Sequence, residues 1–454
     1  MKELILLIAI ITNLSIATAK PLSFEECSKK LLNGLSLEEF KEQNKNRLEE
    51  KDFKKIDRII VRKNCIELLH LAKLRSNGLL ENRHPLSSQI LKTFVTFHRK
   101  WLMPTDYDRI PKCNDTFHND VYDFKAPAYH LTRALFQPDR KASLAVTAYA
   151  DLRSLRAGEN PKKSPITGIT SEQYQKLLKL NEELPLVGEG DLLGFLFKQK
   201  LEIKEIDFTP IMKHKKSFEK TLEERKSGLH RHLGAGLIGS PAFLIHYAPK
   251  GAYRRELYQS DGKTKLPRIL AKSILENLLC ENLASHKYDD EETFEWKHPI
   301  TQEKSCLNCH HSLDNLASGL RNLTYIKSKE SCSADNPQIL LPQYFVSSFS
   351  KKVWSPSKKN GDNEDNKEQE FYTSYPVGNL KGDKENVRFV GLRQLGQVIA
   401  NDKRFYQCQV KKYFQFLYKR PPSHKNIVRW ATEYQNHQDG LRLFKTLIEA
   451  GDQS

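Results

Sequence analysis

After its first twenty residues, the sequence has no apolar run long enough to span a membrane. A membrane-spanning helix needs about 20 consecutive, mostly apolar residues. The run from Leu4 to Ile11 is shorter than that, and it lies between the basic residue Lys2 and the tripeptide Ala17-Thr18-Ala19. A basic start, a short apolar run and small residues before a cleavage point are typical of a secretory signal peptide.

The sequence therefore predicts a signal peptide at residues 1–19 and a mature chain that starts at Lys20. We expect a periplasmic or secreted location and no integral membrane segment after cleavage. The alternative is that the apolar run stays attached as an uncleaved membrane anchor.

No recognised nucleic-acid-binding motif is present, although the formal net charge is +17. The lysines alternate with glutamates, as in residues 41–55, which is typical of a solvated surface. The charge favours an acidic partner protein and peripheral association with anionic surfaces. We expect no nucleic-acid partner.

Among 8 cysteines and 15 histidines, two cysteines and one histidine form the segment Cys306-Leu307-Asn308-Cys309-His310. C-x-x-C-H is the attachment signature of c-type haem. Two thiols three positions apart lie on one side of a helical turn, where they can form thioethers with the two vinyl groups of one porphyrin. The adjacent imidazole then binds the iron. The sequence predicts one haem c, attached covalently at Cys306 and Cys309, with His310 as the proximal iron ligand.

Other uses of this cysteine pair stay open. A thioredoxin-like redox pair would need a strand–helix context, which the sequence around the motif does not show. A structural zinc site would need a second pair of ligands, and Cys332, the next cysteine after the motif, has no second ligand beside it. A disulfide to another cysteine is the third alternative.

Methionine is scarce, and this bears on the sixth iron ligand. The chain has 3 methionines, and none follows the motif, where a small cytochrome c usually provides one. Either a second histidine or an open distal site is therefore favoured. His98, within a predicted helix, is interpreted as a core or surface residue rather than a ligand. The candidate distal ligands are His230, His232, His246, His298, His311 and Met212.

The remaining cysteines are even in number, so an oxidising compartment permits up to three disulfides among them. Their pairing stays open at this point. They are Cys27, Cys65, Cys113, Cys280, Cys332 and Cys408.

Helical spacing of apolar residues dominates the chain and predicts a mainly α fold. A helix start is expected at Ser36, where acidic residues follow a capping serine. A short exposed strand is expected at residues 201–208 and a mobile charged loop at about 350–370. Helices are expected at residues 86–101, 142–155, 171–184, 266–279, 393–400, 405–418 and 426–449.

The length of 454 residues and a charged stretch at residues 210–228 predict two domains after the signal peptide. Residues 20–225 form a helical domain whose role the sequence does not disclose. Residues 226–454 form a helical module with long loops that carries the haem motif.

This second half resembles the cytochrome c-like C-terminal modules of large secreted planctomycete and myxobacterial proteins, a group of domains of unknown function. The resemblance implies a haem-carrying module in an exported protein, and it offers no established reaction. The chain departs from the family after the motif, where Asp314-Asn315 stands in place of Asp-Pro. The similar segments, in the family's order, are residues 235–244, 267–280, 306–314, 389–392 and 405–420.

The function expected from these observations is electron transfer through a single haem, with an acidic redox partner. An alternative is a peroxidase-like, haem-dependent oxidoreductase with an open distal site. Di-haem peroxidases need a second C-x-x-C-H, and this chain has one. A secreted binding protein in which haem is structural is the third hypothesis, so whether the chain is an enzyme stays undecided.

Overall fold

The structure is a computed structural model, and it describes a little under half of the chain's residues. The signal peptide, the domain boundary, the segments 171–184 and 201–208, and the charged loop 350–370 lie outside the described residues. The described residues are 21–74, 81, 84–103, 125–137, 141–148, 151–153, 195–197, 235–240, 243, 246–247, 262–281, 312–317, 319–320, 323–327, 340–344, 377–382 and 386–451.

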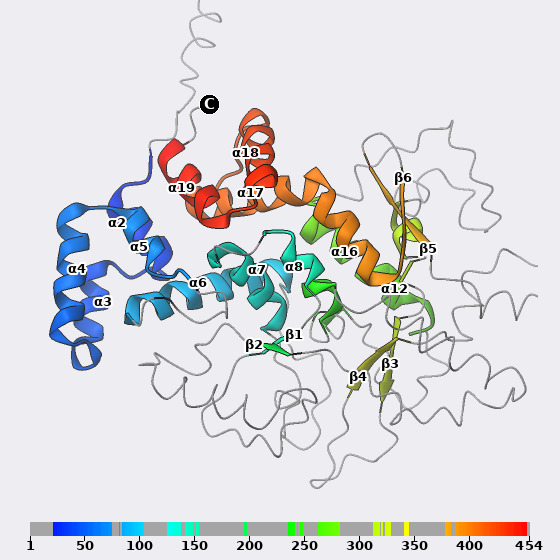
Figure 1. Cartoon of the computed structure of the whole chain (residues 1–454), viewed down its shortest axis with the longest axis horizontal. Helices are drawn as coiled ribbons and strands as arrows, with labels where there is room; N and C mark the ends of the chain where they lie inside the picture. Colours follow the sequence, from blue (N-terminus) through cyan, green and yellow to red (C-terminus); the bar gives the residue numbers. More distant parts are fainter. Residues whose placement is uncertain are drawn as a thin grey trace, which may run out of the picture.

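Four short helices form one end of the molecule (Figure 1). Ser23 and Ser36 cap the first two with capping boxes, in which the side chains of Glu26 and Glu39 accept a bond from the backbone N–H of the serine. Each box satisfies backbone N–H groups that a helix start otherwise leaves unpaired, so the predicted helix start at Ser36 is confirmed. The helices are α2 (Phe24–Leu31), α3 (Leu37–Gln43), α4 (Glu50–Arg62) and α5 (Cys65–His70).

A long helix leads from this end into the middle of the molecule. The predicted helix at residues 86–101 is confirmed as α6 (Pro85–Leu102), with its apolar face buried. It packs against α7 (Ala126–Phe136). The helix predicted at residues 142–155 is wrong beyond its first turn. The structure has the four-residue α8 (Leu144–Thr147) followed by a strand at residues 151–153.

The described part of the C-terminal half is also mainly helical. The predicted helix at residues 266–279 is confirmed, but its last turn is a π-helix. The stretch predicted at residues 426–449 is confirmed as helical, but it forms two helices, because Gln438 adopts the left-handed conformation and Asp439 caps a new helix. The elements are α12 (Gly262–Ser273), η7 (Ile274–Leu278), α16 (Gly391–Asn401), α17 (Lys403–Tyr418), α18 (His424–His437) and α19 (Gly440–Ala450), and a short 3-10 helix η5 (Gly236–Gly239) precedes them.

Strands occur as three separate antiparallel pairs within the described residues. Of these, β5–β6 packs against α16 and the core, and Gly378 of one strand faces Phe389 of the other. The pairs are β1 (Asp151–Arg153) with β2 (Phe195–Phe197), β3 (Leu323–Lys327) with β4 (Leu340–Tyr344), and β5 (Val377–Lys381) with β6 (Asn386–Val390). The predicted mainly α fold is confirmed.

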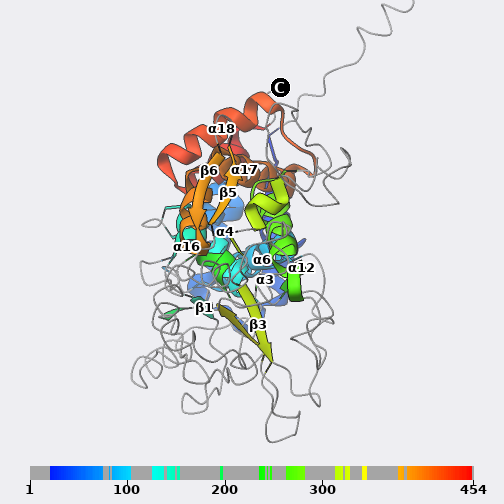
Figure 2. The same ribbon diagram turned by 90° about the vertical axis from the view of Figure 1, so that its right-hand side faces the viewer.

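Helix α17 lies where the two halves of the chain meet. It packs against α2 from the first half and against η7, α16, α18 and α19 from the second. Both views place α17 and α18 on the same side of α6 (Figure 2). Aromatic rings of Phe94 and Phe97 on α6 pack on Phe416 of α17, with centroids 5.4 and 4.7 Å apart. The described helices on either side of the predicted domain boundary therefore share one hydrophobic core.

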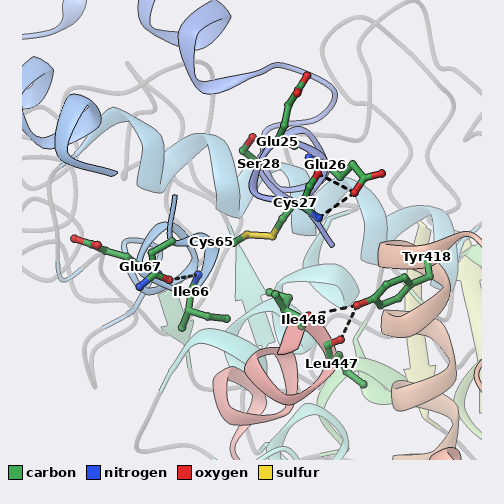
Figure 3. Close-up of a disulfide and its surroundings, with 12 residues drawn as sticks. Glu25, Glu26, Cys27, Ser28, Cys65, Ile66, Glu67, Tyr418, Leu447 and Ile448 are labelled. Atoms are coloured by element: carbon green, nitrogen blue, oxygen red, sulfur yellow. Dashed lines mark hydrogen bonds between the residues drawn. A yellow bond between two sulfur atoms is a disulfide. The ribbon is translucent and has the colours of Figure 1, made fainter. Parts of the chain in front are cut away.

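Two disulfides connect segments of this core. Cys27 on α2 bonds to Cys65 on α5, with Cα atoms 6.2 Å apart (Figure 3). Cys280 bonds to Cys408 on α17, with Cα atoms 5.2 Å apart. Both separations are ordinary for disulfides. The open pairing is thereby resolved for four of the six cysteines, and Cys113 and Cys332 lie outside the described residues.

Candidate functional site

The haem motif itself, with Cys306, Cys309 and His310, lies outside the described residues. The structure describes the chain on either side of it, up to Glu281 before the motif and from Ser312 after it. The geometry of these two flanks shows how the segment that carries the motif is attached to the rest of the protein.

The flank before the motif ends in a widened helical turn. Leu279 donates its N–H to the carbonyl of Ile274, and Glu281 donates its N–H to the carbonyl of Leu275. In a regular α-helix Glu281 would donate to the carbonyl of Asn277. That carbonyl instead accepts a 2.8 Å bond from the indole N–H of Trp101 at the end of α6. A π-turn inside an α-helix is rare and is often found at functional sites. Here it gives α6 a specific contact with the segment leading to the motif.

The Asn277 side chain extends this contact. Its amide donates to Ser273 Oγ at 3.2 Å and to the Tyr247 hydroxyl at 2.9 Å. The Tyr247 hydroxyl in turn donates to the carbonyl of Leu102, the last residue of α6. Burial raises the pKa of Tyr247 to about 12, against the lowering effect of its bonds with Ser273 and Asn277. The phenol therefore stays protonated and acts as a fixed donor at neutral pH.

Two connections hold the end of this flank to the start of α17. Cys280 forms the disulfide with Cys408, and the neighbouring Glu281 pairs with the guanidinium of Arg404, one turn before Cys408. Arg404 also bonds to Asp402, its helix cap, and to the carbonyl of Lys381 on β5. Burial lowers the pKa of Arg404, but bonds to Asp402 and the nearby charges raise it by more, so it remains a cation.

The flank after the motif is a short buried helix at residues 312–317. Its Asp314, whose side chain is 7% exposed, accepts two bonds from Arg268 on α12. The distances are 2.6 Å from Nε to Oδ1 and 3.0 Å from Nη2 to Oδ2. A bidentate pair fixes orientation as well as distance. Both flanks of the motif are thus attached to one helical unit, α12 with η7.

The chain beyond this helix packs closely against the β5–β6 hairpin. A Cβ atom at Gly319 would lie 2.2 Å from the ring of Phe389, and one at Gly378 would lie 2.5 Å from the same ring. Phe389 is fully buried, so its ring has no free space to move into. Glycine at both positions lets the hairpin and the segment after the motif approach each other.

Of the candidate distal ligands, the described residues include His246. It is half-buried beside Tyr247, with ring centroids 4.8 Å apart and the planes at 88°. This places one imidazole next to the Tyr247–Asn277 contact of the first flank. His230, His232, His298, His311 and Met212 lie outside the described residues.

His98 is confirmed as a core residue, because both of its ring nitrogens have partners within the core. Thr132 donates its hydroxyl to the carbonyl of Ala128, so Nδ1 of His98 donates to Thr132 Oγ1 at 2.7 Å. Nε2 then accepts from the Tyr413 hydroxyl at 3.1 Å. Burial lowers the pKa of His98 to about 3, so the ring is neutral. The network joins α6, α7 and α17, and it leaves neither nitrogen for a metal.

The chemistry of the available donors fits haem attachment. All four cysteines among the described residues are in disulfides, and the described residues contain no group of three or more side chains able to hold a metal ion. Two thiols with an adjacent imidazole at residues 306–310 are the donor set of a c-type haem.

No helix in the described part of the chain is long and apolar enough to cross a membrane.

Comparisons with known protein families, with curated proteins and with solved structures find no match for this chain. The resemblance to cytochrome c-like modules therefore stays a prediction from the quoted segments. The structure adds that two of these segments, residues 267–280 and 306–314, are joined through Arg268 and Asp314.

Arg404, Asn277 and the partner of Asp314 were not predicted from the sequence. Each acts through a contact with a residue far away in the sequence, and composition and periodicity carry no information about such contacts. A signal for the β5–β6 hairpin was present. Four residues that include Gly382 and Asp383 lie between two segments with alternating apolar residues, which is typical of a hairpin.

Proposed function

We propose that the chain is an exported monohaem c-type cytochrome-like protein that transfers electrons through a haem bound to Cys306 and Cys309. His310 is the proximal iron ligand in this proposal. The observation that carries it is the C-x-x-C-H segment itself, in a chain that begins with a signal-peptide pattern.

The flanks support the proposal. A haem used for electron transfer benefits from a rigid surrounding, because little then has to reorganise when the iron changes charge. The chain around the motif is held by a disulfide and an ion pair at Cys280 and Glu281, and by Arg268 at Asp314. Disulfides also form and persist in oxidising compartments, as expected for an exported protein.

The haem, when bound, supplies the one-electron chemistry, and the chain's own residues set its surroundings. His310 would hold the iron from one side, and His246 is the candidate distal ligand whose neighbours the structure describes. Bis-histidine ligation would give a lower potential than histidine–methionine ligation.

The experiment that tests electron transfer is an optical spectrum of the haem-loaded protein with and without cyanide and carbon monoxide. A closed, six-coordinate iron whose spectrum does not change supports electron transfer. Rapid binding of cyanide and carbon monoxide, together with turnover of hydrogen peroxide, would contradict electron transfer and favour the peroxidase-like alternative. His246→Ala should open the site to carbon monoxide if His246 is the distal ligand, and His437→Ala, on α18, is the matched control.

A further inference from the structure

A groove of about 910 Å³ lies between α2, α6 and the end of α17. Its floor is apolar, with half-buried Phe97 and Phe416, whose ring centroids are 4.7 Å apart. These helices come from both halves of the chain, so the groove exists only where the halves pack together. It lies around the C-terminal end of α17, whereas the flanks of the haem motif are attached near the N-terminal end of that helix.

Lysines surround this floor. Lys29 and Lys30 come from α2, Lys100 from α6 and Lys419 from the residue after α17, while Glu26 is the acidic residue in the lining. Glu26 is engaged with the Ser23 cap and Lys29 with Glu25. Lys30, Lys100 and Lys419 form no ion pair within the described part of the chain. Burial and the charge of Lys419 both lower the pKa of Lys30, so these cations repel each other across the groove.

We propose that this groove binds a short acidic polypeptide segment that carries apolar side chains. Negative charges on the segment would pair with lysines from three separate helices, and its apolar side chains would cover Phe97 and Phe416. We assign the segment to a partner protein, because the net charge of +17 of this chain favours an acidic partner. The inference does not depend on the haem.

A small anion such as phosphate fits the groove less well. Phosphate sites at helix starts rely on free backbone N–H groups. At the start of α2, which lines the groove, the capping box already uses the N–H groups of Ser23 and Glu26, and a carboxylate already lies there. The cations are also spread over three elements rather than gathered at one point. This arrangement suits an extended ligand with several charges.

The test is fluorescence anisotropy on the full mature chain with a short labelled peptide that alternates acidic residues with Phe and Leu. The comparison ligands are the same peptide with Ser in place of Phe and Leu, a peptide with Lys in place of the acidic residues, and inorganic phosphate. We expect saturable binding of the first peptide, weakening as salt rises. Failure to saturate, equal binding of the Ser peptide, or displacement by phosphate at similar concentration would overturn the proposal.

Two charge reversals locate the site. Lys100→Glu, at an exposed position in the groove, should weaken binding about tenfold, equivalent to about 1.4 kcal/mol. Lys425→Glu makes the same charge change at an exposed, unpaired position of α18 that does not line the groove. It should leave the affinity within about twofold. Equal weakening by both variants would mean attraction by overall charge and would contradict a site in the groove.

Discussion

Arg268 and Asp314 form a bidentate ion pair that joins α12 to the helix directly after the haem motif. The Arg268 side chain is 28% exposed and that of Asp314 is 7% exposed. Removing one partner of such a pair takes the opposite charge away from the other, which is more damaging than the pair is stabilising. The contact therefore fixes the position of the helix at residues 312–317 against α12, and its loss should be measurable as a loss of stability.

Arg268→Met should lower the free energy of unfolding by about 3 kcal/mol, because the buried carboxylate of Asp314 loses both bonds from the guanidinium. Urea denaturation measures this change. The double variant Arg268→Met with Asp314→Leu should be less destabilised than the single one, since both charges are gone. Lys29→Met removes an exposed ion pair with Glu25 and should cost about 0.5 kcal/mol or less. Similar losses from Arg268→Met and Lys29→Met would contradict a structural role for the buried pair.

The two disulfides should differ in their contribution to stability. They close segments with sequence separations of 38 and 128 residues. In the chain-entropy account, the longer loop contributes about 1 kcal/mol more. Replacing both cysteines of each pair by serine and measuring urea unfolding checks this ranking. Peptide mapping without reductant should recover Cys27 linked to Cys65 and Cys280 linked to Cys408, and any other partner for these cysteines would contradict the structure.

Protonation of His98 should contribute to acid unfolding. Its pKa is about 3 in the folded protein against 6.5 ordinarily, so between these pH values the unfolded chain binds one more proton. The stability that this neutral ring contributes is complete above pH 6.5 and is lost as the pH falls toward 3. The slope should reach about 1.4 kcal/mol per pH unit.

The measurement compares unfolding free energies of the natural protein and His98→Gln across this range. Other titrating groups, including His84, are present in both proteins and cancel in the difference. The glutamine variant should be less stable at pH 7 and should show a flatter pH profile. Parallel profiles would show that His98 titrates alike in the folded and unfolded chains.

Gly396 tests how closely α16 and α8 approach. A Cβ atom there would lie 2.1 Å from the carbonyl oxygen of Val146. Glycine to alanine in a helix ordinarily stabilises by about 1 kcal/mol. Gly396→Ala should instead destabilise by about 3 kcal/mol, because backbone must move. Gln397→Ala, at the exposed neighbouring position, should change the unfolding free energy by about 0.5 kcal/mol or less. A more stable Gly396→Ala variant would contradict this packing.

The sequence predicted the elements whose information is local. Helix α6 was found because Leu86, Ile90 and Phe94 recur at helical spacing, and its end was found because Pro104 follows. The break at Gln438 was missed, although Asp439-Gly440, a dipeptide typical of turns, follows it. The Gln438 side chain bonds to Ser143, so a distant segment supports its left-handed conformation.

The candidate site likewise combines a local sequence pattern with contacts between distant residues. The C-x-x-C-H spacing is a local pattern, so the sequence carries it directly. The attachment of its flanks depends on contacts between residues far apart in the sequence. Cys280 bonds to Cys408, 128 residues away, and Arg268 bonds to Asp314, 46 residues away. Sequence periodicity gives no access to such pairings, and a π-turn at Asn277 has no known spacing signature.

The most direct test of the central claim is the mass of the mature protein. The chain is expressed in a host with haem-maturation machinery, purified and weighed under denaturing conditions. Under the central claim, we expect a chain starting at Lys20 with one haem added, and no added haem when Cys306 and Cys309 are both changed to serine. A mature chain without haem, or haem still bound covalently to the double variant, would contradict it.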